Sequence, residues 1–152
     1  MAEIGFYHLT RTPLERALPK LLEKAAARGM RAVVVTGSDE RAEHLNAALW
    51  TYDPASFLPH GTIADGAPEE QPILIADRLS DANGANLLVL TDGARTDAPE
   101  TFERVIDMFD GRDDTAVEAA RERWRKLKEA GHNLTYWQQT EAGGWEQKAQ
   151  SG

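Results

Sequence analysis

The sequence contains no cysteine, and this absence excludes several kinds of structure and chemistry. The chain cannot form a disulfide, a thiolate nucleophile or a cysteine-ligated zinc site. Long apolar runs are also missing, because no stretch approaches the roughly 20 residues that span a bilayer. Residues 1–10 lack a basic region followed by a long apolar segment, so we expect no secretory signal. We therefore expect a cytoplasmic protein that does not contact a membrane.

Positive charge is in the minority in this chain. There are 25 acidic and 17 basic residues, which gives a formal net charge of −8. The overall field of such a chain repels polyanions, so we expect no direct binding of nucleic acid. A local cluster of cations must then bind any acidic partner. A length of 152 residues and a hydrophobic content of 41% are sufficient for one compact domain with a core.

The apolar residues alternate between strand-like and helix-like spacing. Short apolar runs predict strands at residues 3–9, 31–37, 72–77 and 86–93. In the first of these, Ile4 and Phe6 share one face, to which His8 can also belong, and Tyr7 lies on the other. A helical stripe follows Pro13 and ends near Gly29; it consists of Leu14, Leu18, Leu21, Leu22 and Ala25. Ser38 or Asp39 can cap a second helix, which carries Ala42, Leu45, Leu49 and Trp50.

The remaining segments are less regular. Residues 52–72 are rich in proline and glycine and predict a loop with at most a short extended piece. Residues 98–110 fit either a helix or a strand. The last helix is predicted to begin with a capping box, in which Glu118 follows Thr115, and to end at Gly131.

This alternation predicts an α/β fold. We expect a three-layer, Rossmann-like and mostly parallel sheet of about five strands, with helices on both faces. Residues 1–140 are expected to form a single domain, and the polar residues 141–152 a flexible C-terminal tail.

The motifs that give such a sheet its usual chemistry are missing. The chain has no P-loop, and residues 8–13, after the first strand, contain no glycine for dinucleotide binding. Asp92 follows an apolar strand, as a magnesium-binding aspartate would, but without a P-loop it is better explained as the start of a turn. The four histidines are scattered, and no Gly-x-Ser-x-Gly elbow is present. We therefore expect no cofactor, no metal and no catalytic activity.

The basic helix near the C-terminus is the most informative segment. Residues 119–134 read AARERWRKLKEAGHNL and place five cations around one tryptophan. Helical spacing predicts a stripe that packs on the sheet, formed by Val117, Ala120, Trp124 and Leu127. Three cations lie along one edge of this stripe: Arg121, Arg125 and Lys128. Arg123 and Lys126 are assigned to solvent.

Two explanations fit this pattern. The first is an ordinary solvated helix face. The second is a cationic pocket, in which forked guanidinium groups bind carboxylates beside the aromatic wall of Trp124. Its ligand would be an acidic peptide that ends in an apolar residue and a free carboxylate.

Three segments resemble the bacterial DNA polymerase III chi subunit family. Residues 120–134 resemble that family's C-terminal helix, an Ala-Arg-x-Arg-aromatic-basic run that ends in Ala-Gly-x-Asn-Leu. Residues 41–61 are similar to its Leu-x-x-Ala-Leu-Trp segment followed by Ser-Phe-x-Pro-His, and FYHL at 6–9 resembles its first strand. The matches occur in the family's order and span nearly the whole chain.

The resemblance implies an α/β adaptor without nucleotide chemistry. Members of the family link the clamp-loader complex of the DNA polymerase III holoenzyme, through the psi subunit, to the acidic C-terminal tail of single-stranded DNA-binding protein (SSB). The resemblance places the tail site on Arg121, Trp124 and Arg125, where the family often has tyrosine in place of the tryptophan. Val117 stands where some members have a lysine, and Lys128 is a candidate substitute. The psi-binding face falls on Trp50 and Phe57.

Two functions of other classes stay open at this point. One is a degenerate nucleotide-binding enzyme. The other is a protein that binds single-stranded DNA directly, with bases stacked on Trp124 between the arginines, although the net charge opposes it.

Overall fold

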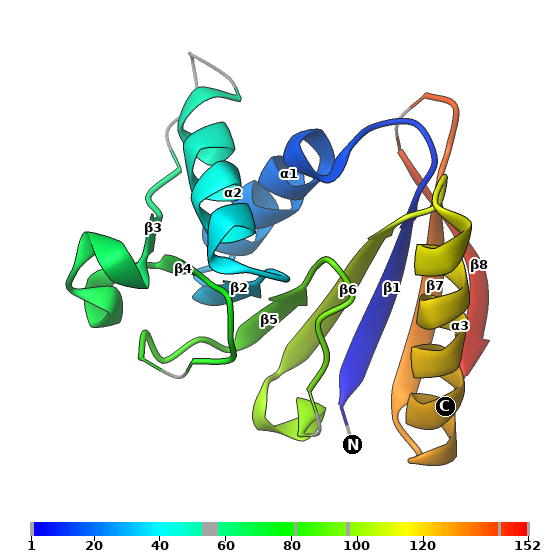
Figure 1. Cartoon of the computed structure of the whole chain (residues 1–152). Coiled ribbons are helices and arrows are strands. Elements are labelled where there is room, and N and C mark those ends of the chain that lie inside the picture. The colour runs from blue at the N-terminus through cyan, green and yellow to red at the C-terminus, as the bar shows by residue number, and fades with distance from the viewer. Residues whose placement is uncertain (1, 53–57, 81, 97, 143, 152) are drawn as a thin grey trace.

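The computed structural model of the chain describes residues 2–52, 58–80, 82–96, 98–142 and 144–151. Eight strands in these residues form one sheet, in the order β3-β4-β2-β5-β6-β1-β7-β8 (Figure 1). The strands are β1 (Glu3–Leu9), β2 (Ala32–Val35), β3 (Gly61–Thr62), β4 (Ile73–Ala76), β5 (Leu87–Leu90), β6 (Arg104–Asp110), β7 (Asn133–Gln139) and β8 (Trp145–Ser151). All neighbours are parallel except β7 and β8. The predicted mostly parallel sheet is confirmed, with more strands than the five expected.

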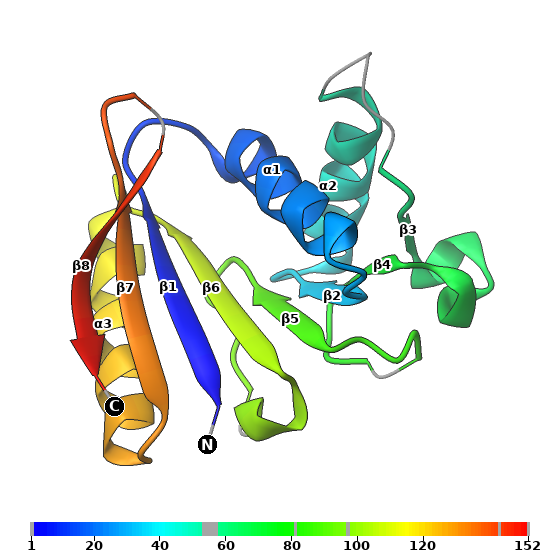
Figure 2. The same ribbon diagram turned by 180° about the vertical axis from the view of Figure 1, so that it is seen from behind.

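Helices cover both faces of the sheet. The helices α1 (Leu14–Ala27) and α2 (Asp39–Thr51) lie on one face, and α3 (Asp114–Glu129) lies on the other (Figures 1 and 2). The core is accordingly divided into two layers, one containing Leu18 and Leu45 and the other containing Phe6 and Ala120. Among the described residues, no helix has the length and apolar character needed to cross a membrane.

Local sequence accounts for most of these elements. All four residues of β2 are buried, because Val33 and Val35 face the α3 side while Val34 faces the other layer. Ser38 caps α2 by accepting a hydrogen bond from the backbone N–H of Arg41 at 3.1 Å. Gly29 and Gly131 follow α1 and α3 with left-handed φ values of 75° and 87°. The predicted helix boundaries at these residues are confirmed.

In their described residues, the two irregular segments consist of short turns and strands. Residues 52–72 contain β3, the short extended piece that was expected, and 3₁₀ turns at Ile63–Asp65 and Pro68–Glu70. Residues 98–110 contain a 3₁₀ turn at Pro99–Thr101 and then β6. β6 forms a strand because it pairs with both β5 and β1 and so buries five consecutive residues.

The capping box predicted at Thr115 and Glu118 is wrong. The N-cap of α3 is Asp113, whose carboxylate accepts hydrogen bonds from the N–H groups of Thr115 at 3.0 Å and Ala116 at 3.4 Å. A carboxylate at this position satisfies free N–H groups and also lies at the positive end of the helix dipole, which a threonine hydroxyl exploits less.

The predicted flexible tail at 141–152 is wrong for Trp145–Ser151, which form β8 antiparallel to β7. The ring of Trp145 packs edge-on against Tyr7, with centroids 5.0 Å apart. The residues between Trp145 and Ser151 are exposed. The strand therefore has no apolar alternation that the sequence could display.

The assignment of Arg123 to solvent is also wrong. The Arg123 side chain is only 7% exposed, and it forms a two-point ion pair with Asp107 of β6, at 2.6 Å and 2.9 Å. Burial raises the pKa of the Asp107 carboxyl, whereas the hydrogen bonds and charge of Arg123 lower it. The charge of each side chain therefore compensates the cost of burying the other.

Removing one member of this pair is expected to destabilise the fold. We expect Arg123→Met to lower the free energy of unfolding by about 3–5 kcal/mol, because Asp107 keeps a buried charge without a partner. Lys126→Met is the matched control on the same helix, where the side chain is 61% exposed. Urea denaturation measures both. The double change Asp107→Leu with Arg123→Met should recover most of the loss; a double variant as unstable as the single one would contradict this account.

Candidate binding face on helix α3

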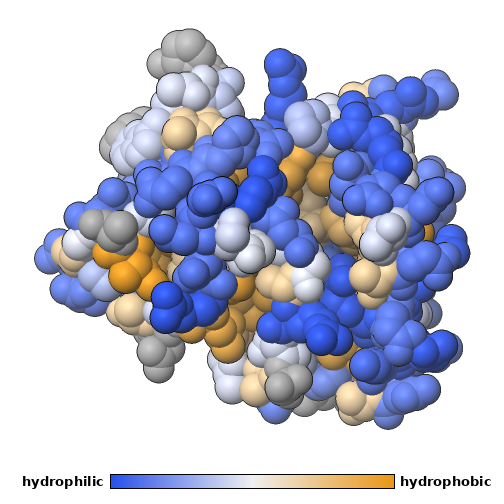
Figure 3. Space-filling view, viewed as in Figure 1, coloured by the Kyte–Doolittle hydropathy of each residue, from blue (hydrophilic) through white to orange (hydrophobic). Residues whose placement is uncertain are grey.

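Helix α3 packs across β6, β1 and β7 through one apolar stripe. Ala120 is buried, and Val117, Trp124 and Leu127 are partly buried against the same core layer. The predicted packing stripe is therefore confirmed. The opposite side of the helix faces solvent, and hydrophilic side chains dominate the surface over it (Figure 3).

Trp124 stands at the boundary between this core and the surface. Its ring packs at steep angles against Phe6 at 5.5 Å and Tyr136 at 5.8 Å, so β1 and β7 hold it in place. Its partial burial leaves part of the indole accessible. A fixed, half-exposed aromatic ring of this kind can receive an apolar side chain from a ligand.

Two arginines flank Trp124 on the exposed side. Arg121 is 70% exposed and lies 3.6 Å from Glu118, one turn earlier. Arg125 forms the equivalent ion pair with Glu122. Exposed pairs of this type are worth only about 0.2–1 kcal/mol. A ligand carboxylate can therefore replace either glutamate at little cost.

The other two predicted site residues lie at the ends of this face. Lys128 is exposed and has no ion pair within the described residues. Val117 belongs to the packing stripe and contributes apolar surface rather than charge. We define the α3 face as Val117, Arg121, Trp124, Arg125 and Lys128.

Two further residues, His8 and Tyr136, adjoin the α3 face. His8 Nδ1 lies 2.6 Å from the Tyr136 hydroxyl, and the two rings pack at 5.8 Å. Burial lowers the pKa of His8, a hydrogen bond to the Gly111 backbone raises it, the charge of Arg121 lowers it and that of Asp110 raises it. Burial also raises the pKa of Tyr136, which Arg121 opposes. Arg121 therefore lies close to both groups.

The sequence places His8 on the face of Phe6 but does not connect it to the basic helix. The connection depends on the pairing of β1 with β7, which sets Phe6 opposite Tyr136. Gly111 adds a second constraint, because a Cβ at this position would lie 1.9 Å from His8 Cδ2. The alternation of residues along β1 was the only signal in the sequence that put His8 on this side of the sheet. Its contact with Tyr136 joins residues far apart in the chain and could not be read from local spacing.

The second candidate face lies on α2, at the other end of the sheet from α3 (Figure 1). Trp50 is 49% exposed, and its ring is tilted against His60 at 4.1 Å. The buried His60 has its ring nitrogens 2.6 Å from the Leu58 carbonyl oxygen and 3.0 Å from that of Asn46, which fixes this segment to α2. Phe57 lies outside the described residues.

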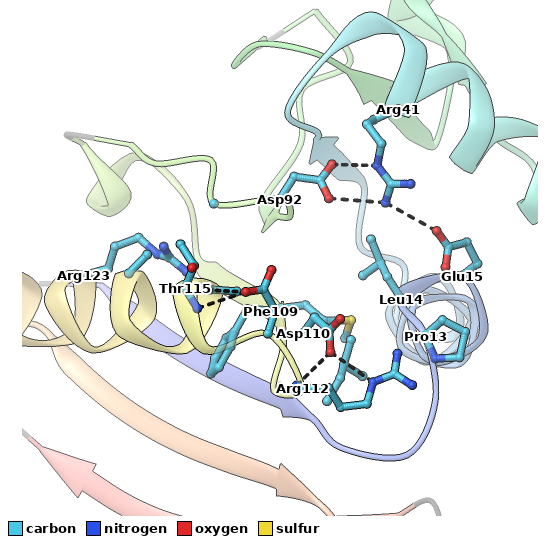
Figure 4. Close-up of a pocket in the computed structure, with 16 residues that line it drawn as sticks. Pro13, Leu14, Glu15, Arg41, Asp92, Phe109, Asp110, Arg112, Thr115 and Arg123 are labelled. Carbon is cyan, nitrogen blue, oxygen red and sulfur yellow. Dashed lines mark hydrogen bonds and ion pairs between the residues drawn. The ribbon is translucent and has the colours of Figure 1, made fainter.

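A third location, at the carboxyl ends of β1, β5 and β6, is where sheets of this kind usually bind ligands. The structure has a cavity of about 530 Å³ there, lined by apolar side chains such as Leu14 and Phe109 (Figure 4). The arginines that line it are paired with carboxylates. Arg41 lies 3.2 Å from Asp92 and 3.4 Å from Glu15, and Arg112 lies 3.2 Å from Asp110. Asp92 occupies a turn, as predicted, with a left-handed φ of 54°.

The loop after β1 has no free donors for a phosphate. Its N–H groups at Thr10, Arg11 and Thr12 all donate to Gln139 Oε1, at 3.3, 2.8 and 3.0 Å. Gln139 is buried, and its amide nitrogen donates to the Thr12 hydroxyl at 2.8 Å. The side chain of Gln139 thus occupies the three backbone N–H groups of the loop that leads from β1 to α1.

The proximity of Arg121 to His8 can be measured in solution. We expect Arg121→Ala to raise the pKa of His8 toward its ordinary value of 6.5, because a neighbouring positive charge opposes protonation. The pKa should stay below 6.5, since burial is the larger cause. NMR titration of the ring protons measures this. Arg125→Ala is the matched control and should leave His8 unchanged; an identical His8 pKa in the Arg121 variant would show that the two groups are apart.

Comparison with known proteins identifies the family of the chain. A family model described as DNA polymerase III chi subunit, HolC, matches residues 1–135. The probable DNA polymerase III subunit chi of Rickettsia prowazekii (strain Madrid E) is 33% identical over 117 residues, which cover 72% of this chain and 71% of that protein. The DNA polymerase III subunit chi of Escherichia coli (strain K12) is 28% identical over 107 residues, 70% of this chain and 72% of the relative. That of Haemophilus influenzae (strain ATCC 51907 / DSM 11121 / KW20 / Rd) is 29% identical over 109 residues, 70% and 74% of the two chains. The chain therefore belongs to the DNA polymerase III chi subunit family.

Proposed function

We propose that this chain is a non-catalytic accessory subunit of the DNA polymerase III clamp-loader complex. In this role it works in the cytoplasm and links that complex to SSB by binding the acidic C-terminal tail of SSB. The observation that carries the proposal is the α3 face, where Arg121 and Arg125 flank the half-exposed Trp124. Membership of the chi family supports the replication role.

The α3 face offers the chemistry that an acidic tail requires. The terminal carboxylate binds Arg121 and Arg125, which are one helical turn apart and project in the same direction. The apolar end of the tail packs on Trp124 and on the exposed part of Val117. Lys128 supplies a third cation for the acidic residues that precede the end. Tyr136, whose hydroxyl lies 2.6 Å from His8 Nδ1, borders the site.

Ion-pair exchange keeps the cost of binding low. In the free protein, Glu118 and Glu122 partly neutralise the two arginines. A bound tail displaces these glutamates, which then return to water, so each guanidinium exchanges one carboxylate for another. The site gains affinity from the apolar contact and from the two-point geometry of the guanidinium groups.

The region around Gln139 favours an accessory role over a degenerate nucleotide-binding enzyme. The three N–H groups of the loop after β1 already donate to one side chain of the same chain. A nucleotide phosphate would have to displace a buried amide that also bonds Thr12.

We also propose that the psi subunit binds the α2 face, centred on Trp50. An exposed tryptophan at the end of a helix, held against a buried histidine, has the properties of an interface anchor. Phe57 is assigned to the same interface by the family resemblance. The α2 and α3 faces cover opposite ends of the sheet, so both partners can bind at once.

Opposite changes on α3 should alter tail affinity in opposite directions. We expect Arg121→Ala to weaken binding of an SSB tail peptide roughly ten- to a hundredfold, since a charge-assisted contact contributes about 1.5–3 kcal/mol. Glu118→Gln removes the competing carboxylate and should strengthen binding by up to about fivefold. Isothermal titration calorimetry measures both variants. Lys126→Ala, an exposed cation off the α3 face, is the control; equal affinity in all four proteins would leave α3 a solvated helix without a ligand.

The α2 face is tested by a variant that separates the two partners. We expect Trp50→Ala to weaken binding of the psi subunit by about thirtyfold or more, because a central interface tryptophan contributes at least about 2 kcal/mol. Tail-peptide affinity should not change, since α3 is untouched. His44→Ala, exposed on another side of α2, is the matched control. Psi binding that survives in Trp50→Ala would move that interface elsewhere; surface plasmon resonance with immobilised psi gives the affinities.

A further inference from the structure

Helix α1 carries an unpaired ladder of positive charge. Three cations of the helix and one at its C-cap recur every fourth residue, at Arg16, Lys20, Lys24 and Arg28, and all four side chains are exposed. Within the described part of the chain none of them forms an ion pair, although nine other cations do. In a protein of net charge −8, nearby carboxylates are plentiful, so an unpaired row of this length requires an explanation.

The acidic residues nearest to this ladder are bound to other groups. Glu15 accepts from Arg41 at 3.4 Å and lies 3.5 Å from His44 Nε2. Glu23 accepts a hydrogen bond from the Tyr52 hydroxyl. Both carboxylates are thus directed toward α2. They therefore do not neutralise the cations of α1.

The ladder faces aromatic side chains on a part of the sheet without a covering helix. Figure 2 shows α1 and α2 toward the β5 and β2 part of the sheet, while no helix lies over β7 and β8 on this side. Trp137 stacks on Tyr7 at 6.2 Å and 13°, and Trp145 packs edge-on against Tyr7. Trp137 and Trp145 stay partly exposed. They supply flat aromatic surface next to the positive charge.

Two adjoining cavities connect the cations with the aromatic rings. One, of about 700 Å³, is lined by Arg16, Lys20 and Trp145. The other, of about 310 Å³, is lined by Lys24, Arg28 and Trp145, and also by Arg104, which donates to the Tyr7 hydroxyl at 3.2 Å. We call this continuous surface the α1 groove. It lies on the opposite side of the sheet from the α3 face.

We propose that the α1 groove binds single-stranded nucleic acid, with phosphates along α1 and bases against Trp145 and Trp137. Cations four residues apart rise about 6 Å each along the helix, which suits a polymer with one charge per repeat. Indole rings give bases a stacking surface whatever their sequence. An acidic peptide would satisfy the charges but has no flat rings to place on the tryptophans.

The net charge of −8 does not prevent this binding. At physiological ionic strength, charges separated by more than about 8 Å are largely screened. Among the residues that line the groove, the cations of α1 and Arg104 outnumber the two carboxylates, Glu15 and Glu23, so its net charge is positive. The excess of acidic charge keeps polyanions away from the rest of the surface.

Salt dependence gives a quantitative test with the full chain and a fluorescently labelled oligothymidylate. Four neutralised phosphates predict a slope of about −3 for the logarithm of the binding constant against the logarithm of salt concentration, from roughly −0.7 per contact. We expect Lys20→Ala and Lys24→Ala each to reduce that slope by about 0.7. Alanine is the best helix former, so these exposed changes keep α1 folded. A slope near zero, or one unaffected by the two changes, would overturn the proposal.

The bases are tested separately from the charges. We expect Trp145→Leu to weaken oligothymidylate binding about tenfold, while Trp145→Phe retains most of it. Circular dichroism and urea unfolding check that β8 persists in both variants. An abasic oligonucleotide or an oligoglutamate of the same charge that binds as tightly as oligothymidylate would overturn the assignment to nucleic acid.

The two faces can be distinguished with one set of variants. Arg125→Ala, on the opposite side of the sheet, should leave oligothymidylate binding unchanged. The Lys20 and Lys24 variants should bind the SSB tail peptide normally. Loss of oligonucleotide binding in Arg125→Ala would place the nucleic acid on α3 and contradict the α1 groove, whatever the outcome of the tail experiments.

Discussion

The buried ion pair between Arg123 and Asp107 determines which residues of α3 face solvent. Asp107 sits on the central strand β6, between β5 and β1, so the guanidinium that it binds must point into the protein. Arg121 and Arg125 are each two residues from Arg123, and a step of two residues turns about 200° around a helix. Fixing Arg123 inward therefore turns both arginines outward together. Trp124, one residue on, is left at the side of the helix, where it meets Phe6 and Tyr136. The geometry of the α3 face thus follows from one contact in the core.

A second internal contact lies at the carboxyl ends of the strands, where α/β sheets of this kind usually bind ligands. Gln139, at the end of β7, gives one amide oxygen to three N–H groups of the loop after β1. This bond ties the outer strand to the start of α1 and leaves the loop no donors for an anion. Around the neighbouring cavity, Arg41 and Arg112 are held by carboxylates. Because these groups at the carboxyl edge of the sheet are bound within the chain, we look for the binding surfaces on the outer sides of α1 and α3.

The sequence predicted the elements whose signals are local and missed those that depend on distant contacts. The stripe Val117–Ala120–Trp124–Leu127, the Ser38 cap and the apolar strands follow from spacing and cap chemistry, and all are present. Arg123 was misassigned because a cation beside an apolar stripe looks solvated unless its partner on β6 is known. β8 was missed because it is polar and exists only through its pairing with β7 and the contact of Trp145 with Tyr7. For the same reason, the helix periodicity revealed Arg121 and Arg125, whereas Tyr136 and His8 became neighbours of the site only through the register of β1 with β7.

The two proposed binding surfaces share their supporting strands. On β1, Phe6 and His8 point toward α3 while Tyr7 points toward α1, and on β7, Tyr136 and Trp137 divide in the same way. Their charges differ in kind: Arg121 and Arg125 are paired with glutamates of the same helix, whereas the α1 cations have no acidic partner among the described residues. The acidic remainder of the protein offers a free polyanion no other place to bind, so only collisions at the α1 groove itself lead to attachment. If the tail of SSB binds the α3 face as proposed, it holds SSB and the strand that SSB covers nearby, which raises the effective concentration of single strand at the groove. Weak binding of the strand by the α1 groove then contributes only where SSB is already present. In this scheme the α3 face binds the SSB tail first, and the groove contacts the strand afterwards.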